Sequence, residues 1–259
     1  MIRGVLFDLG HTLWDIGPHA PALDQAYDDA RTLLVERLGR EDLPGARAIQ
    51  RAVRDVLIEA SETYFASDGT YATMSVQVEQ PPSTQWIDLG CRAVGLELDG
   101  ALLAEITPPL FSTELDGLIC GEGTTEALQA LAADGYRLGC ITNTLADGAG
   151  IRAMLRRHGI EELMGSVVVS ADEGFRKPHR SLFEKAMLEI NTAPHESIYV
   201  GDSPVHDIAG AKAAGMFAVL TQQYAARPYD GFEPQPDAVI THVRELTAVI
   251  AHLDALPER

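Results

Sequence analysis

The sequence predicts an α/β fold in which a doubly wound parallel sheet carries an inserted all-helical domain. Two observations predict it. From about residue 118 onward, short apolar runs alternate with helical patterns, whereas residues 17–117 show mainly helical spacing. Uninterrupted apolar strands between helices are typical of a parallel sheet that is covered on both faces. We therefore assign residues 1–16 and 118–259 to a core domain and residues 17–117 to a helical domain.

The apolar runs of the core domain give its expected strands in order. The chain starts with one such run and resumes the pattern after the helical domain. The expected strands cover residues 2–8, 137–142, 167–170, 198–201, 217–221 and 238–240, and helices are expected near 151–158, 181–190, 205–214 and 243–253. In open sheets of this kind the ligand site lies at the carboxyl ends of the strands, where the strand order reverses.

Four helices are expected in the helical domain, because its apolar residues recur three and four positions apart. The proline pairs Pro81-Pro82 and Pro108-Pro109 are expected to separate helices, since proline interrupts helical hydrogen bonding. The apolar faces are Leu23, Tyr27, Ala30 and Leu34; Ile49, Val53, Val56, Ala60 and Tyr64; Trp86, Leu89 and Ala93; and Leu102, Leu103 and Ile106.

The acidic balance of the chain argues against two classes of partner. There are 38 acidic and 20 basic residues, a formal net charge of −18, which repels nucleic-acid backbones and anionic membranes. No apolar run approaches a membrane span, and the N-terminus lacks the pattern of a signal peptide. Cys91, Cys120 and Cys140 form no CxxC pair and are expected to be reduced. We expect a cytoplasmic protein that binds neither nucleic acid nor membrane; no pattern indicates its oligomeric state.

Polar residues follow four of the expected strands. Asp8 ends the first strand, Thr142 the second, Lys177 lies in the loop after the third, and Asp202 and Asp207 follow the fourth. Because carboxyl ends of parallel strands share one edge, these side chains should meet there. A cluster of carboxylates is unstable unless a cation neutralises it, and a few hard oxygen ligands favour Mg²⁺.

These residues carry a resemblance to a known family. The segment Asp8 to Thr12, then Thr142, Lys177, and Asp202 with Asp207, resembles the four ordered motifs of the haloacid dehalogenase-like superfamily. The four motifs occur in the family's order, each after a strand, which makes the match specific. The resemblance covers essentially the whole chain. It implies a Rossmann-like core, with residues 17–117 as a helical cap domain inserted after the first strand.

The resemblance implies a nucleophile and a metal site. Asp8 would attack phosphorus and form an aspartyl-phosphate. Mg²⁺ would be held by the Asp8 side chain, the Gly10 backbone carbonyl and the Asp202 side chain, and would position the phosphoryl group. Asp207 would orient the metal ligands, through water or Lys177. The implied substrate is a small phosphorylated metabolite.

The resemblance also implies groups that bind the phosphoryl oxygens. Thr142 would donate a hydrogen bond to one of them. Lys177 would act as a point charge that holds nucleophile and phosphate together. Asn143 is a further candidate for binding the phosphoryl group or the cap domain.

Position 10 departs from the family's phosphatase pattern, which has a second aspartate two residues after the nucleophile. That aspartate protonates the leaving group, and Gly10 has no side chain to do so. General acid–base help is typically worth ~10²–10⁴-fold in rate. Four explanations stay open: substrates with good leaving groups, such as acyl or aryl phosphates; replacement of the acid, with the adjacent His11 as nearest candidate; carbon–halogen cleavage; or a catalytically weak binding protein.

The metal motif favours one of these explanations over the others. Asp202 and Asp207 retain the phosphatase-type pattern, whereas the family's haloacid dehalogenases need no metal and carry a bulky residue where this chain has Gly10. We therefore predict a Mg²⁺-dependent phosphohydrolase. A dehalogenase-like hydrolase acting on carbon, and a regulatory protein that binds Mg²⁺ and phosphate with little turnover, are the alternatives.

Overall fold

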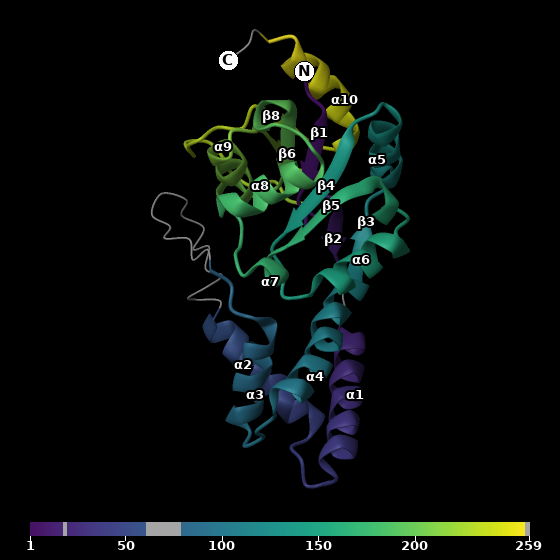
Figure 1. The fold of residues 1–259 in the computed structure, drawn as a ribbon, viewed down its shortest axis with the longest axis vertical. Coiled ribbons are helices and arrows are strands. Elements are labelled where there is room, and N and C mark those ends of the chain that lie inside the picture. Colours follow the sequence, from purple (N-terminus) through teal and green to yellow (C-terminus); the bar gives the residue numbers. More distant parts are fainter. Residues whose placement is uncertain (18–19, 61–78, 257–259) are drawn as a thin grey trace.

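Six parallel strands form the central sheet of the computed structural model, which describes residues 1–17, 20–60 and 79–256. The strand order is β5-β4-β1-β6-β7-β8 (Figure 1). Gly4 pairs with Arg137 on one side and with Ser197 on the other, which sets the register of the central strand. The strands are β1 Gly4–Phe7, β4 Arg137–Thr142, β5 Met164–Val169, β6 Ser197–Gly201, β7 Phe217–Thr221 and β8 Ala238–Ile240.

The first strand lies in the middle of the sheet because all of it is apolar and buried. Val5 and Phe7 pack into the larger hydrophobic cluster on one face, and Leu6 packs into the second cluster on the other. From β1 the chain builds outward first to β4 and β5, then on the opposite side to β6, β7 and β8. The strand order therefore reverses at β1, where a ligand site is expected.

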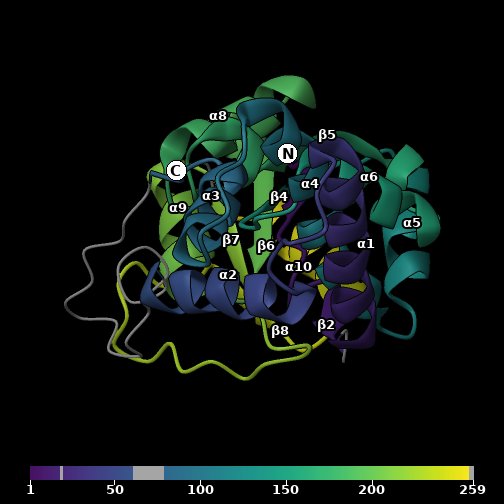
Figure 2. The same ribbon diagram turned by 90° about the horizontal axis from the view of Figure 1, so that it is seen from below.

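Helices cover both faces of the sheet, as the continuous apolar strands predict. One face is covered by α5 and α6 together with the last helix, and the other by α8 and α9 (Figure 2). The bounds are α5 Thr124–Ala133, α6 Gly148–Arg157, α7 Ser170–Glu173, α8 Arg180–Glu189, α9 Ala209–Ala213 and α10 Leu246–Asp254. The core is thus the α/β fold that the sequence predicts.

Four further helices pack on one another and lie beyond the carboxyl ends of the strands (Figure 1). They are α1 Ala20–Leu38, α2 Ala46–Ala60, α3 Ser83–Ala93 and α4 Gly100–Ser112. A two-stranded antiparallel ribbon joins them to the core, in which β2 (Trp14–Ile16) pairs with β3 (Leu118–Cys120). The chain therefore leaves the core and returns to it at the same place. No helix in the described part of the chain is long and apolar enough to cross a membrane.

Some expected boundaries were wrong. Pro108 and Pro109 lie inside α4 instead of ending it. The helix continues because its last turn buries Leu110 and Phe111, each at most 3% exposed. The two carbonyl groups that lose a partner belong to exposed residues, which water can reach.

Two further predicted boundaries, both in the core domain, differ from the structure. One predicted residue lies outside the part of the chain that the structure describes. The strand expected at 167–170 begins three residues earlier, at Met164. The helix expected near 205–214 starts as a π-helical turn, Pro204–Ile208, and continues as α9. The second helix was expected to reach Tyr64, which the structure does not describe. None of these differences moves the strand ends at which the polar residues lie.

Candidate active site

Asp8 is held at the carboxyl end of the central strand. Its N–H donates to the Val200 carbonyl at 2.8 Å, which continues the ladder between β1 and β6 by one residue. The chain then turns, with the His11 N–H donating to the Trp14 carbonyl at 2.7 Å. The Thr12 hydroxyl lies 3.4 Å from Asp8 Oδ2. The carboxylate is therefore buried, 7% exposed, and fixed in direction by the turn that follows it.

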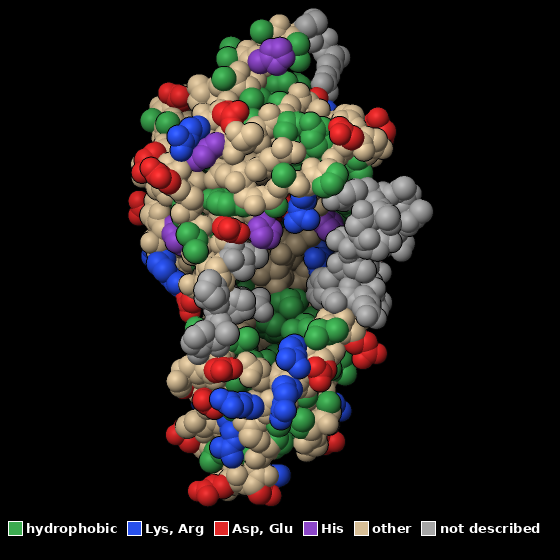
Figure 3. All heavy atoms as spheres, turned by 180° about the vertical axis from the view of Figure 1, so that it is seen from behind, with side chains coloured by type: hydrophobic (Ala, Val, Ile, Leu, Met, Phe, Trp, Pro, Cys, Tyr) green, Lys and Arg blue, Asp and Glu red, His purple; other side chains and the backbone are tan. Residues whose placement is uncertain are grey.

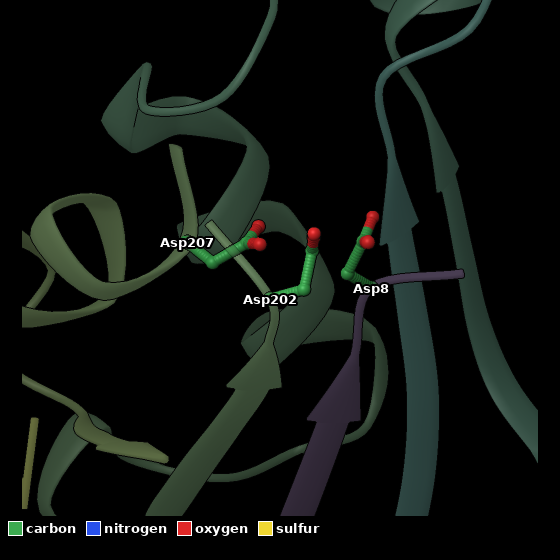
Figure 4. Close-up of side chains that lie close together, drawn as sticks. All are labelled: Asp8, Asp202 and Asp207. Atoms are coloured by element: carbon green, nitrogen blue, oxygen red, sulfur yellow. The ribbon is translucent and has the colours of Figure 1, made fainter. Parts of the chain in front are cut away.

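Two more carboxylates come from the end of β6. Asp202 directly follows the strand, and Asp207 returns to it from the π-helical turn, where its Oδ2 accepts from the Ser203 N–H at 2.9 Å. Gly201 permits this approach, because a Cβ at that position would lie 2.3 Å from Asp207 Cγ. Oxygen atoms of Asp8, Asp202 and Asp207 lie within 4.8 Å of one another (Figure 4).

Lys177 joins this cluster from the loop after β5. Its Nζ donates to Asp8 Oδ1 at 2.5 Å, to Asp207 Oδ1 at 2.7 Å and to the Tyr199 hydroxyl at 3.0 Å. All three donor sites of the ammonium group are used, and the side chain is 2% exposed. Lys177 therefore links the two strand ends that carry Asp8 and Asp207.

The loop that carries Lys177 is fixed by Asn143. The Asn143 side-chain oxygen accepts from the Lys177 N–H at 2.8 Å, and its amide nitrogen donates to the Lys177 carbonyl at 3.2 Å. Both polar atoms of this side chain are therefore bonded to the backbone of Lys177. Thr142, the preceding residue, is 6% exposed and lines the same cavity.

The cluster carries an excess of negative charge. The pKa of Asp8 is raised to about 7, because burial, helped by Asp207 and Asp202, outweighs the opposing effect of Lys177. The pKa of Asp202 is raised by burial and by Asp207, against the Arg227 guanidinium, whose Nε donates to Asp202 Oδ2 at 2.5 Å. Three buried carboxylates face two cations, so one more cation would be stabilised here.

A divalent cation fits these donors. The carboxylate oxygens are hard ligands, they converge, and each still has lone pairs that Lys177 and Arg227 do not use. Gly10 lines the same space two residues after Asp8. Three of the four predicted metal ligands, Asp8, Asp202 and Asp207, are thus brought together, and their donors suit a hard divalent cation such as Mg²⁺.

The cluster lies at one side of a cavity of about 650 Å³ between the sheet and the helices. Figure 3 looks into this hollow, with hydrophobic side chains on the side of the helical segment. All eight candidate site residues of the sequence analysis line the cavity, namely Asp8, Gly10, His11, Thr142, Asn143, Lys177, Asp202 and Asp207. His11 lies at its rim, with Nδ1 3.5 Å from Asp15 Oδ1.

Two residues of the cluster, Tyr199 and Arg227, were not among the predicted site residues. Tyr199 lies inside β6, where its hydroxyl accepts from Lys177 and donates to the Ile141 carbonyl at 3.1 Å. A tyrosine in an otherwise apolar buried strand needs a partner for its hydroxyl, and this is the signal that was available. Arg227 lies in the loop between β7 and β8, where no motif or periodicity marks it.

Comparison with known proteins agrees with this architecture. A family model described as haloacid dehalogenase-like hydrolase matches residues 2–215, most of the chain. The chain belongs to the haloacid dehalogenase-like hydrolases. The resemblance stated from the motifs is therefore confirmed, and the chain is assigned to a family of hydrolytic enzymes.

The chain is similar to phosphatases and to solved structures over most of its length. A glyceraldehyde 3-phosphate phosphatase of Methanopyrus kandleri is 27% identical and aligns with 98% of this chain and 99% of its own. The Pyrococcus abyssi protein of the same name is 28% identical over 85% of this chain and 81% of its own. A 2-haloacid dehalogenase from Pseudomonas syringae pv. Tomato DC3000 has a TM-score of 0.65 at 25% identity, covering 97% and 99% of the two chains.

Proposed function

We propose that this hydrolase is a Mg²⁺-dependent phosphatase of small phosphorylated molecules, with Asp8 as its covalent nucleophile. The observation that carries the proposal is the buried cluster in which Lys177 binds Asp8 and Asp207 beside Asp202. Such a cluster suits a ligand that brings both a cation and an anionic phosphoryl group. The names of the two phosphatase relatives, which align over most of the chain, support the same reaction class.

The groups that surround Asp8 would orient it for attack. Lys177 holds one carboxylate oxygen, and the Thr12 hydroxyl lies beside the other. A nucleophile whose direction is fixed before the substrate arrives loses little entropy on reaction. Attack on phosphorus would give an aspartyl-phosphate, which water then hydrolyses.

The phosphoryl group would be received by residues around Asp8. Thr142, which is buried and lines the cavity, would donate a hydrogen bond to a phosphoryl oxygen, and Lys177 would supply positive charge. Asn143 contributes by positioning Lys177, since both ends of its amide group bond to the Lys177 backbone. Mg²⁺, held by Asp8, Asp202 and the Gly10 carbonyl with Asp207 beside them, would offset the charge of the phosphoryl group.

The helical segment would serve as a cap domain. It lies over the strand ends, and Leu57 of α2 lines the cavity together with core residues. A segment in this position excludes water from the phosphoryl group and contacts the rest of the substrate. We assign residues 17–117 to this cap and residues 1–16 and 118–259 to the catalytic core.

Hydrolysis of p-nitrophenyl phosphate and acetyl phosphate tests the proposal. Phosphate release by the wild-type protein should require Mg²⁺, and Asp8→Asn should lower kcat at least ~10³-fold, because the nucleophile is removed. Asp134→Asn, an exposed aspartate after α5, is the matched control and should retain wild-type rates. Undiminished turnover in Asp8→Asn would contradict the proposal.

A dehalogenase acting on carbon is the second candidate. The similarity to the 2-haloacid dehalogenase and the absence of a carboxylate at Gly10 favour it, since a departing halide needs no proton. The buried cluster that Asp202 and Asp207 form with Asp8 disfavours it, because three converging carboxylates suit a metal ion that halide departure does not require. Halide release from 2-haloacids without Mg²⁺, in the absence of phosphatase activity, would decide for this candidate. Tight binding of phosphate with no hydrolysis of either activated ester would indicate a regulatory protein.

A further inference from the structure

Gly10 leaves open space beside the nucleophile. It lines the cavity, and a Cβ built on it meets no heavy atom within 4 Å. Its φ is outside the left-handed region that favours glycine, unlike that of Gly123 or Gly174. Neither packing nor backbone conformation therefore requires a glycine here. A side chain would fit at this position, and its absence leaves the departing group without the acid that the phosphatase pattern of the family places there.

The other carboxyl groups of the cavity do not replace that acid. Among the described residues that line it, the carboxyl groups are those of Asp8, Asp202 and Asp207. Lys177 binds Asp8 and Asp207, and Arg227 binds Asp202. All three are thus engaged with cations at the phosphoryl side of the cavity.

Much of the rest of the cavity lining is apolar. Besides Leu9 and Val205, which neighbour the carboxylates in sequence, the apolar lining residues come from α2, the segment before and at the start of β3, the loop after β4, and α6; they are Leu57, Leu115, Leu118, Leu145, Ile151 and Met154. A phosphate group fills only a small part of about 650 Å³. The remaining space suits an apolar group joined to the phosphate, because its burial is favourable and demands no hydrogen-bond partners.

We propose, on the basis of the phosphatase function above, that the site takes phosphate derivatives whose leaving group is apolar and departs as a stabilised anion. Aryl phosphates and acyl phosphates of apolar acids share this chemistry. An Asp8 oxygen forms a bond to phosphorus while the bond from phosphorus to the leaving oxygen breaks, and that oxygen keeps the electron pair as a phenolate or carboxylate. Water then attacks phosphorus and the bond to Asp8 breaks. Both water hydrogens end on the phosphate, which loses one to solvent.

Phenyl phosphate and benzyl phosphate form the decisive substrate pair. They are nearly equal in size and polarity, but phenol is a far stronger acid than benzyl alcohol. The ratio of their kcat/KM values reports the formation of the aspartyl-phosphate, whichever later step limits kcat. Without an acid at position 10, the wild-type protein should prefer phenyl phosphate at least ~10²-fold.

Substitutions at position 10 test the cause of this preference. Gly10→Asp supplies the missing acid in open space. It should lower the ratio of kcat/KM for phenyl phosphate to kcat/KM for benzyl phosphate at least tenfold, which is within the ~10²–10⁴-fold range of general acid catalysis. Gly10→Asn has the same shape and cannot transfer a proton, so the ratio should persist. An equal decrease of the ratio in both variants would overturn the assignment of the preference to a missing proton donor.

Two further measurements address the leaving group itself. Benzoyl phosphate is an acyl phosphate and phenyl phosphate is an aryl phosphate. The compound with the larger kcat/KM at equal Mg²⁺ concentration indicates which of the two classes the site prefers. Leu57→Asn makes part of the apolar wall polar and should raise KM for the preferred aromatic substrate at least ~3-fold, more than it raises KM for acetyl phosphate. A larger effect on acetyl phosphate would contradict an apolar leaving-group site.

The outcomes separate this inference from the phosphatase function. Similar kcat/KM values for phenyl and benzyl phosphate in a wild-type protein that needs Asp8 would overturn the inference and leave the phosphatase intact. A tenfold increase of this kcat/KM ratio in His11→Gln would also overturn the inference, because His11 would then be the proton donor in the wild-type protein. No phosphate release from any of these compounds would overturn both proposals.

Discussion

The two sides of the cavity are built by different means. On the sheet side, Asp8, Asp207 and Tyr199 each bond to Lys177, and backbone groups at the strand ends hold them. The other side is formed by apolar side chains from α2, α6 and the segments between them, which make no directional bonds. We infer that the first side sets the reaction and the second sets the leaving group. Substitutions on the sheet side should therefore change chemistry for every substrate.

The largest effect after loss of the nucleophile is expected at Lys177. Lys177→Met removes the cation between Asp8 and Asp207 and leaves buried carboxylates without it, which typically costs about 3–5 kcal/mol of stability. We expect kcat for p-nitrophenyl phosphate to fall at least ~10²-fold, because Asp8 loses its orientation and the phosphate loses a positive charge. Rates are measured at saturating Mg²⁺, on protein whose circular dichroism shows that it is folded.

Lys185→Met is the matched control for this prediction. Lys185 also pairs with a carboxylate, Glu173, at 2.6 Å, but it lies on α8 with a side chain that is 41% exposed. Its substitution should leave kcat within about twofold, since exposed ion pairs contribute little. If the Lys177 variant is unfolded, Lys177→Arg keeps the charge with a different geometry, and a wild-type rate in that variant would contradict the orienting role.

The second prediction concerns Mg²⁺ binding and pH. Burial raises the pKa of Asp8 to about 7 in the metal-free protein, against 3.8 in the unfolded chain. Between these values the folded state holds a proton that the unfolded chain has lost, so this group stabilises folding less as pH rises. Mg²⁺ must displace that proton, and its affinity should therefore fall as pH drops through about 7.

Thermal unfolding measures this dependence directly. At one hundred times its Kd, Mg²⁺ stabilises the folded state by about 2.7 kcal/mol, which corresponds to a rise in Tm of about 5–10 °C for a chain of this size. We expect such a rise at pH 8 and about half of it at pH 6 for the same Mg²⁺ concentration, because a pKa of about 7 weakens the apparent affinity about tenfold between these pH values. Asp202→Asn should abolish the rise at both pH values. An equal rise at pH 6 and pH 8 would show that Asp8 does not exchange a proton for the metal.

The sequence predicts the sheet side of the cavity far better than the opposite side. Asp8 and Asp202 are visible because each breaks an apolar run where a strand must end, and the parallel topology then brings them together. Arg227 is not visible, since its partner Asp202 is 25 residues away and only the path of the loop brings them into contact. The apolar wall is hidden for a related reason: Leu57 and Met154 fit helical patterns as core residues, and packing alone decides that they border a cavity.

The smallest effect is expected at Tyr199, and it tests how far the bonded network extends. Tyr199→Phe removes a hydroxyl that accepts from Lys177 and donates to the Ile141 carbonyl, so one donor and one acceptor lose a partner in a buried site. We expect a loss of about 1–3 kcal/mol in the free energy of unfolding, measured with urea. Activity should fall less than about fivefold, because Lys177 keeps both carboxylates.

Tyr136→Phe is the control for the loss of a hydroxyl group. Tyr136 directly precedes β4, at the end of the strand away from the cavity. Its substitution should change neither the free energy of unfolding nor kcat by much. A loss of kcat in Tyr199→Phe as large as in Lys177→Met would contradict a purely supporting role. It would mean that two carboxylates alone cannot hold the ammonium group in its working position. The active network would then reach through Tyr199 into the middle of β6, one layer deeper than the strand ends that the sequence marks.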